Sequence, residues 1–81
     1  SYVNKIINIY PNPFSSSFVI DADKKIRDIK IYDTRGRVAL KKNKLVGKNN
    51  FNLKRESNGI YIFSFRLNGE RYNIKIIKKG L

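Results

Sequence analysis

The chain has 81 residues, which suffices for one small domain and excludes a second. It contains no cysteine and no histidine, which excludes disulfides, thiolate metal sites, the best nucleophile and the usual general base near neutral pH. Its net charge of +12 favours an anionic partner, such as nucleic acid, lipopolysaccharide, an acidic membrane face or an acidic receptor groove, although lysines also keep exposed strands soluble.

The chain begins at Ser1 with neither an initiator methionine nor a basic-then-apolar leader. No apolar run approaches the roughly 20 residues that cross a bilayer. We therefore expect a soluble part of a longer protein, without a transmembrane segment.

Short runs of β-forming residues, most of them separated by turn residues, occupy the first half of the chain. Strands are predicted over residues 6–10, 16–20, 26–32 and 37–42. The first ends at Pro11-Asn12-Pro13, and the second ends at Asp21-Ala22-Asp23. The third and fourth are joined by Asp33-Thr34-Arg35-Gly36, which is typical of a type I turn with glycine in the left-handed conformation.

The second half of the chain continues the same pattern. Gly47-Lys48 is a possible turn before a short strand over residues 50–53. Strands over 60–67 and 70–77 are joined by Asn68-Gly69, the best short hairpin signal in the chain. No window of ten residues shows helical periodicity.

Seven short strands predict an all-β fold, because turns every 8–12 residues are typical of a sandwich or a small barrel. A single sheet would expose its apolar face, so we expect a two-sheet antiparallel β-sandwich that is immunoglobulin-like. The predicted core consists of Phe18, Ile29, Ile31, Val38, Leu40, Phe51, Leu53, Tyr61, Phe63, Phe65, Ile74 and Ile76.

Residues that carry catalytic chemistry are sparse. Asp21 and Asp23 could offer oxygens to a calcium ion, but the glycine and distal glutamate of a calcium loop are missing. Asp33 is expected to accept backbone hydrogen bonds within its own turn. We predict no catalytic residues, no metal and no cofactor, and therefore no enzymatic activity.

Four motifs in order give the chain a family resemblance. Tyr10-Pro11-Asn12-Pro13-Phe14 resembles the opening of type A C-terminal sorting domains of type IX secretion cargo, which are found in Bacteroidetes. Further matches to the family pattern are Ile31 to Val38, Asn58-Gly59-Ile60-Tyr61-Ile62 and the closing run from Tyr72 to Lys79. The motif residues are Pro11, Asn12, Pro13, Asp33, Gly36, Arg37, Gly59 and Tyr61.

This resemblance implies that residues 6–81 form a non-catalytic sorting domain and that residues 1–5 link it to an upstream cargo domain in the same precursor. It also implies passage through the periplasm, recognition by the outer-membrane translocon and removal by a sortase-like surface peptidase. The cargo is then expected at the cell surface or outside the cell.

The closing strand is the predicted recognition segment, with Lys75, Ile76, Ile77, Lys78 and Lys79 as its residues. We expect Tyr72, Ile74 and Ile76 to point inward, and all three lysines to face solvent on an unpaired sheet edge. An equally simple interpretation is that these lysines only protect that edge. For the motif prolines and glycines, their roles in shaping the local backbone are enough to explain why they are present.

Two other functions are consistent with the sequence. An accessory carbohydrate-binding module of a secreted enzyme would need an exposed aromatic platform, for which Tyr2, Tyr10 and Tyr32 are candidates. A nucleic-acid-binding domain is suggested by charge alone, but the strand aromatics follow core periodicity, so no nucleic acid partner is predicted.

Overall fold

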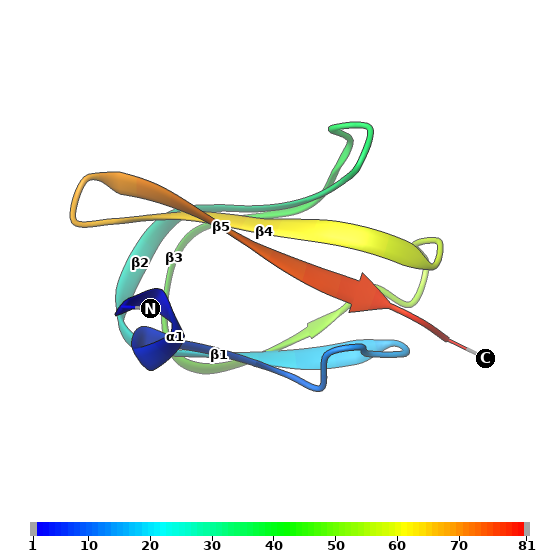
Figure 1. The fold of residues 1–81 in the computed structure, drawn as a ribbon, viewed down its shortest axis with the longest axis horizontal. Helices are drawn as coiled ribbons and strands as arrows, with labels where there is room; N and C mark the ends of the chain where they lie inside the picture. Colours follow the sequence, from blue (N-terminus) through cyan, green and yellow to red (C-terminus); the bar gives the residue numbers. More distant parts are fainter. Residues whose placement is uncertain (1, 81) are drawn as a thin grey trace.

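The computed structural model describes residues 2–80 and is built almost entirely from strands (Figure 1). One short helix precedes five antiparallel strands. The elements are α1 (Tyr2–Ile6), β1 (Ile7–Tyr10), β2 (Ser17–Asp33), β3 (Val38–Asn52), β4 (Gly59–Leu67) and β5 (Glu70–Lys78). The all-β prediction is confirmed.

The strands form one sheet that curls into two facing layers (Figure 1). Its order is β1-β2-β4-β5, and β3 pairs with the other edge of β2. The pairing of β2 with β3 shifts register between Ala22 and Ile26, where both strands bend. Residues 17–22 lie with β1 in the lower layer, and residues 27–33 pair with β4 in the upper layer.

Seven predicted segments therefore become five strands. The predicted second and third strands join as β2, and the fourth and fifth join as β3. Gly47, where a turn was expected, pairs with Ala22 inside the bend and has φ +74°. A bend within a continuous pair of strands has a sequence like that of a turn, because both need glycine or polar residues.

The helix α1 was not predicted. Its five residues are too few to show a helical stripe, and its stability depends on packing rather than on propensity. Ile6, at its end, is buried in the core, and Val3 packs against the core.

Most of the predicted core is confirmed: nine of the residues are buried, and Leu40 and Ile74 pack half-buried against them. Val38 is the exception, with 46% of its surface exposed. The register shift next to Ile31 explains this error, since Ile31 lies opposite Leu40 while Tyr32 lies opposite Val38. The core also contains residues that were not predicted: Ile6, Ile7, Phe14, Ile20, Ala22, Ile26, Leu45 and Leu67.

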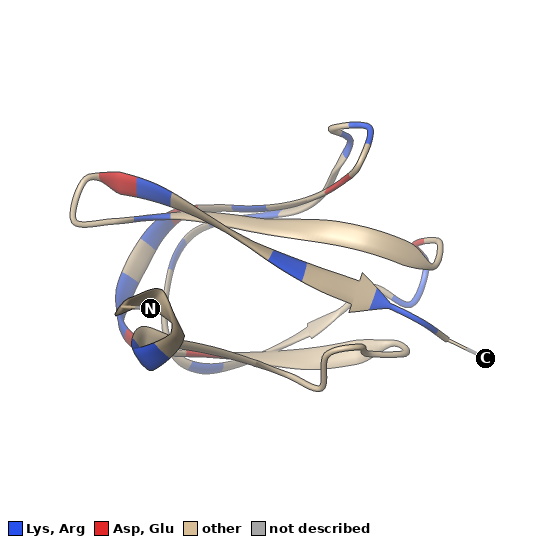
Figure 2. Cartoon of the chain, viewed as in Figure 1, with Lys and Arg blue, Asp and Glu red and all other residues tan. Residues whose placement is uncertain are grey.

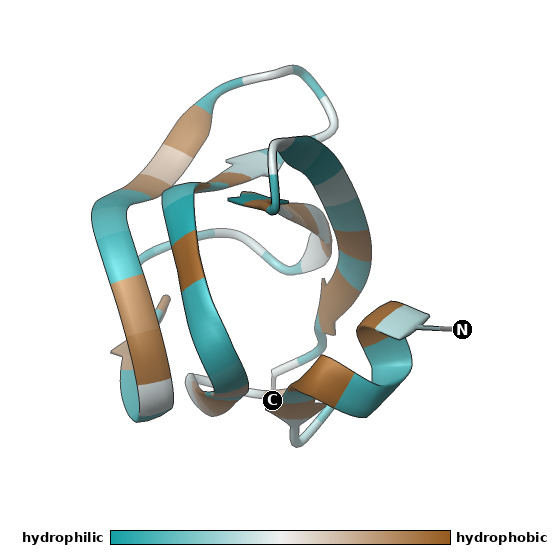
Figure 3. Ribbon diagram, turned by 90° about the vertical axis from the view of Figure 1, so that its left-hand side faces the viewer, coloured by the Kyte–Doolittle hydropathy of each residue, from teal (hydrophilic) through white to brown (hydrophobic). Residues whose placement is uncertain are grey.

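The strands surround a common interior when the molecule is viewed along its length (Figure 3). Aromatic rings fill much of that interior. Phe14 lies 4.5 Å from Phe18 between ring centroids, and Phe63 lies 5.0 Å from Phe65. No helix among residues 2–80 is long and apolar enough to cross a membrane.

Candidate functional site

The Pro11-Asn12-Pro13 segment lies against the outer edge of the terminal strand. The Asn12 side chain accepts a hydrogen bond from the Ile77 N–H at 3.0 Å. Its amide group also donates to the Lys75 carbonyl at 3.4 Å. The side chain of Asn12 thus replaces the backbone of a neighbouring strand.

Phe14 continues this pairing with its own backbone. Its N–H donates to the Ile77 carbonyl at 2.9 Å, and its carbonyl accepts from the Lys79 N–H at 2.8 Å. Phe14 and Lys78 form a parallel bridge, which joins the two layers along this side. The expectation that the terminal strand presents an unpaired edge is therefore wrong for residues 75–79.

The three terminal lysines do not share one environment. Lys75 and Lys79 are exposed, as predicted, but Lys78 is only 8% exposed. The Lys78 ammonium donates to the Asn58 side-chain oxygen at 3.2 Å. The alternation that directs Ile74 and Ile76 inward also directs Lys78 inward, so the expectation that it faces solvent is wrong.

The last strand is held from the β4 side as well. The Asn58 side-chain oxygen accepts a hydrogen bond from the Gly80 N–H at 3.0 Å. Ile76 is completely buried, and Ile77 is half-buried. Asn58 belongs to the third motif, but no local pattern predicts this role, because its side chain caps residues that lie 20 or more positions away.

The hairpin between β2 and β3 is organised by Asp33. Its carboxylate accepts hydrogen bonds at 2.9 Å from the Arg35 and Arg37 N–H groups, and it forms an ion pair with the Arg37 side chain at 3.2 Å. Gly36 closes the turn with φ +85°, a conformation that favours glycine. The hydrogen bond from the Arg37 N–H is the largest cause that lowers the pKa of Asp33 below its usual value.

This lowered pKa predicts a pH-dependent contribution to stability. Asp33 should stabilise the folded state fully above its ordinary pKa of 3.8, and this contribution should disappear as the pH falls through the lower folded value. We expect Asp33→Ala to lower the melting temperature at pH 7. The difference from the unmodified chain should shrink as the pH falls below 4. Thermal unfolding between pH 7 and pH 2 measures this, with Asp23→Ala as an exposed control; a difference that is constant with pH would contradict it.

Tyr61 and Gly59 lie beside this hairpin. Tyr61 is directly opposite Asp33 in the pairing of β2 with β4, and Gly59 is opposite Lys78 in the pairing of β4 with β5. The Tyr61 hydroxyl donates to the Ser57 carbonyl, and burial of the ring raises the pKa of Tyr61. Gly59 has φ +145° and starts β4.

All four sequence motifs therefore lie towards one end of the molecule, in the right half of Figure 1. Residues 11–14 and 59–61 both contact the terminal strand, and residue 33 pairs with residue 61. We call this the motif end and define it as residues 11–14, 33–37, 57–61 and 75–80. A hollow of about 280 Å³ lies between its second and third segments. The structure thus brings together motif residues that are up to 68 positions apart in the sequence, from Pro11 to Lys79.

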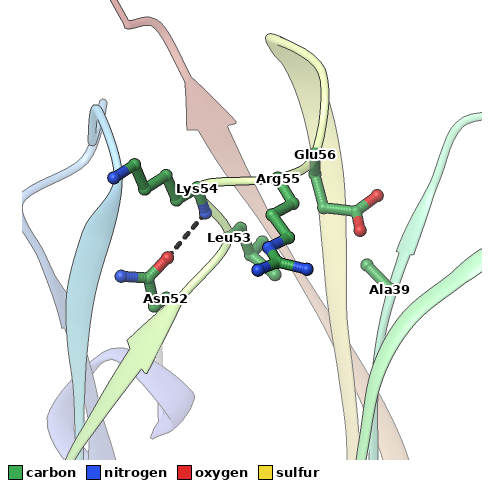
Figure 4. Close-up of a pocket in the computed structure, with 6 residues that line it drawn as sticks. All are labelled: Ala39, Asn52, Leu53, Lys54, Arg55 and Glu56. Atoms are coloured by element: carbon green, nitrogen blue, oxygen red, sulfur yellow. Dashed lines mark hydrogen bonds between the residues drawn. The ribbon is translucent and has the colours of Figure 1, made fainter.

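A second hollow, of about 410 Å³, lies beside the loop that follows β3 (Figure 4). Lys54, Arg55 and Glu56 line it, and the carboxylate of Glu56 points towards Ala39. The Lys54 N–H donates to the Asn52 side chain at 2.7 Å, which fixes the start of this loop. Within residues 2–80, no three side chains of the metal-binding types cluster together.

The family assignment follows from comparison with known proteins. A family model described as the secretion system C-terminal sorting domain matches residues 8–79 and so covers all four motifs. No curated protein and no solved structure matches the chain. Domains of this family are C-terminal signals of type IX secretion cargo, which reaches the cell surface or is secreted. The chain belongs to the family of secretion system C-terminal sorting domains.

Proposed function

We propose that the outer-membrane translocon recognises this sorting domain at the motif end, without any chemistry carried out by the domain itself. The placement of the four motifs at one end of the molecule, two of them in contact with the terminal strand, carries this proposal. Residues 6–81 act as the signal, and residues 1–5 connect it to the cargo. The domain passes through the periplasm with its cargo, and a sortase-like surface peptidase removes it afterwards.

Within the motif end, the exposed and the buried residues have different roles. Lys75 and Lys79 are exposed and are available to a partner, together with the half-buried Ile77. Ile76 and Lys78 are buried and support the fold. Asn12 acts on the terminal strand through the backbone of Lys75 and Ile77 and so fixes how the exposed side chains are presented.

The other motif residues shape the surface around this strand. Pro11 and Pro13 flank Asn12 and restrict its backbone. Gly36 and Gly59 have positive φ at the hairpin and at the start of β4, and Arg37 closes the Asp33 turn. The family match does not favour a carbohydrate-binding or nucleic-acid-binding role.

Replacing two exposed lysines should separate recognition from folding. The domain is fused to a passenger protein, and Lys75→Gln and Lys79→Gln are made in the domain. Surface export of the passenger should fall, because the charge-complementary encounter of the domain with the translocon loses two positive groups. Stability should change by less than about 0.5 kcal/mol per site, because both side chains are exposed. Surface yield in a type IX host and the melting temperature of the domain are the two measurements.

Two control variants complete this experiment. Lys48→Gln with Lys54→Gln removes two exposed positive charges from other segments, and export should stay normal. Lys78→Gln should lower the melting temperature, because Lys78 is buried and donates to Asn58. Normal export of the Lys75 and Lys79 variant with unchanged melting would show that these lysines only solubilise the strand.

A further inference from the structure

Basic side chains lie directly opposite one another across four neighbouring strands of the upper layer. Lys44 in β3 pairs with Arg27 in β2, and Arg27 pairs with Arg66 in β4. Arg66 in turn pairs with Arg71 in β5. We call Lys44, Arg27, Arg66 and Arg71 the basic row. Figure 2 shows basic residues on each of these strands.

The basic row lies on the outer face of the sheet. Arg27 follows the buried Ile26, and Lys44 precedes the buried Leu45 that lies opposite Ile26. Successive side chains of a strand point to opposite faces, so the row points away from the core. All four of its residues are exposed.

A second pair of like charges lies next to this row. Lys30 in β2 is opposite Lys41 in β3. Lys41 is exposed, and Lys30 is half-buried. These six basic residues lie on the outer face and come from four strands.

Like charges placed directly opposite each other destabilise a sheet. Carboxylates relieve this repulsion at one position only, where Asp28 contacts Arg71. Among residues 2–80, the other ion pair joins Asp33 and Arg37, so Lys44, Arg27 and Arg66 have no carboxylate partner. Arg71 also donates hydrogen bonds to the Asp28 carbonyl and to the Ser64 hydroxyl, and Arg66 donates to the Gly69 carbonyl. Within residues 2–80, no hydrogen bond or ion pair of the side chain accounts for Arg27 or Lys44.

A hollow of about 460 Å³ lies at the same place and is lined by basic groups. Lys25, Arg27 and Arg66 contribute their side chains, and the β4–β5 turn forms its wall. In the part of the chain that the structure describes, no acidic residue lines this hollow. Arg66 is oriented there by a hydrogen bond to the Gly69 carbonyl at 3.4 Å.

The spacing of the row indicates the kind of ligand. Neighbouring strands lie about 4.8 Å apart, so four strands spread the basic groups over about 14 Å. That span matches several anionic groups side by side rather than one small anion. Arginine binds phosphate, like carboxylate, through two parallel hydrogen bonds, and a surface of closely spaced phosphates supplies several such groups over this span.

Nucleic acid fits this face poorly, although it also carries phosphates. Single-stranded recognition combines basic grooves with exposed aromatic side chains that stack on bases. The exposed tyrosines, Tyr2 and Tyr10, belong to α1 and to the end of β1, and the row itself contains no aromatic residue. An array of phosphates without bases is the better match.

We propose that the basic row docks this domain on the phosphate groups of an anionic membrane surface. The contact is electrostatic, and it orients the domain with the outer face of the upper layer towards the lipid. It is separate from the motif end, because Arg27 and Lys44 lie outside all four motif segments. The proposal therefore does not depend on how the translocon recognises the domain.

Vesicle binding by the 81-residue chain tests this docking. The chain should co-sediment with vesicles that contain phosphatidylglycerol and not with vesicles of phosphatidylcholine alone. Arg27→Gln with Lys41→Gln and Lys44→Gln should weaken this binding about tenfold or more, since each basic group near the surface contributes to the attraction. High salt should abolish binding of the unmodified chain.

A matched variant separates the arrangement of the charges from their number. Lys5→Gln with Lys48→Gln and Lys54→Gln also removes three exposed charges, but it leaves the row intact. Its binding should fall less than about threefold. Equal losses in the two variants would show that net charge alone acts, and would overturn the proposal.

Stability gives a second readout that does not need a ligand. The variant of Arg27, Lys41 and Lys44 should melt at the same or a higher temperature, because it removes repulsion between opposed basic residues of β2 and β3. A clear fall in melting temperature would show that the row supports the fold, and would overturn the proposal. Binding of the unmodified chain to poly-glutamate but not to anionic vesicles would also overturn the proposal, since that result identifies an acidic protein partner.

Discussion

Replacing Phe14 with alanine is expected to cost about 3–5 kcal/mol of the free energy of unfolding, as for other buried aromatic residues. Phe14 is 1% exposed and packs against Phe18. Loss of its ring would leave a cavity where the segment after β1 meets the terminal strand. Proteins have total stabilities of about 5–15 kcal/mol, so the variant should lose a large fraction of its stability and unfold at a clearly lower urea concentration. Urea denaturation followed by circular dichroism measures the change.

Tyr10 provides the control for this change. It is an aromatic residue on the other side of the same proline segment, and it is 44% exposed. Tyr10→Ala should cost much less than Phe14→Ala. If both variants lost the same stability, the placement of Phe14 inside the core would be wrong.

The second large effect concerns the neighbours Ile76 and Ile77. Ile76→Ala should cost about 2–5 kcal/mol, because Ile76 is completely buried. Ile77→Ala should cost less, since its side chain is half-buried on the opposite face of β5. The difference in denaturation midpoint between the two variants measures this asymmetry.

Export of a fused passenger extends this comparison. The variant of Ile76 should lose export together with its folded structure. The variant of Ile77 should stay folded, so any loss of export would come from the recognised surface. If the Ile77 variant were unstable and the Ile76 variant stable, Ile76 would not point into the core. Lys78, which lies on the same face of β5, would then not point inward either.

These pairs explain why the terminal strand is difficult to dissect by deletion. Residues 75–79 alternate between side chains that hold the fold and side chains that are available to a partner. Their backbone also carries the hydrogen bonds from Asn12 and Phe14. Removing the segment would therefore destroy the fold and the recognised surface together, whereas single substitutions separate them.

The sequence by itself determined the class of the fold and the family. Alternation of apolar residues marked most of the core strands, because a strand with one buried face must repeat every second residue. Turn chemistry placed both tight hairpins: Gly36 has φ +85°, and Asn68-Gly69 has positive φ at both residues. The four motifs identified a sorting domain, since their order and spacing are specific even though each motif alone is weak.

The tertiary structure alone decided which predicted segments join into one strand, and that residues 12–14 cover the outer edge of β5. The bends at residues 22–26 and at Gly47 continue their strands, because pairing between β2 and β3 persists through them. Asn12, Phe14 and Asn58 act on residues 20 to 65 positions away, and no local pattern reports such contacts. The basic row likewise depends on register: residues that are ordinary surface charges within each strand become opposed neighbours only when four strands align.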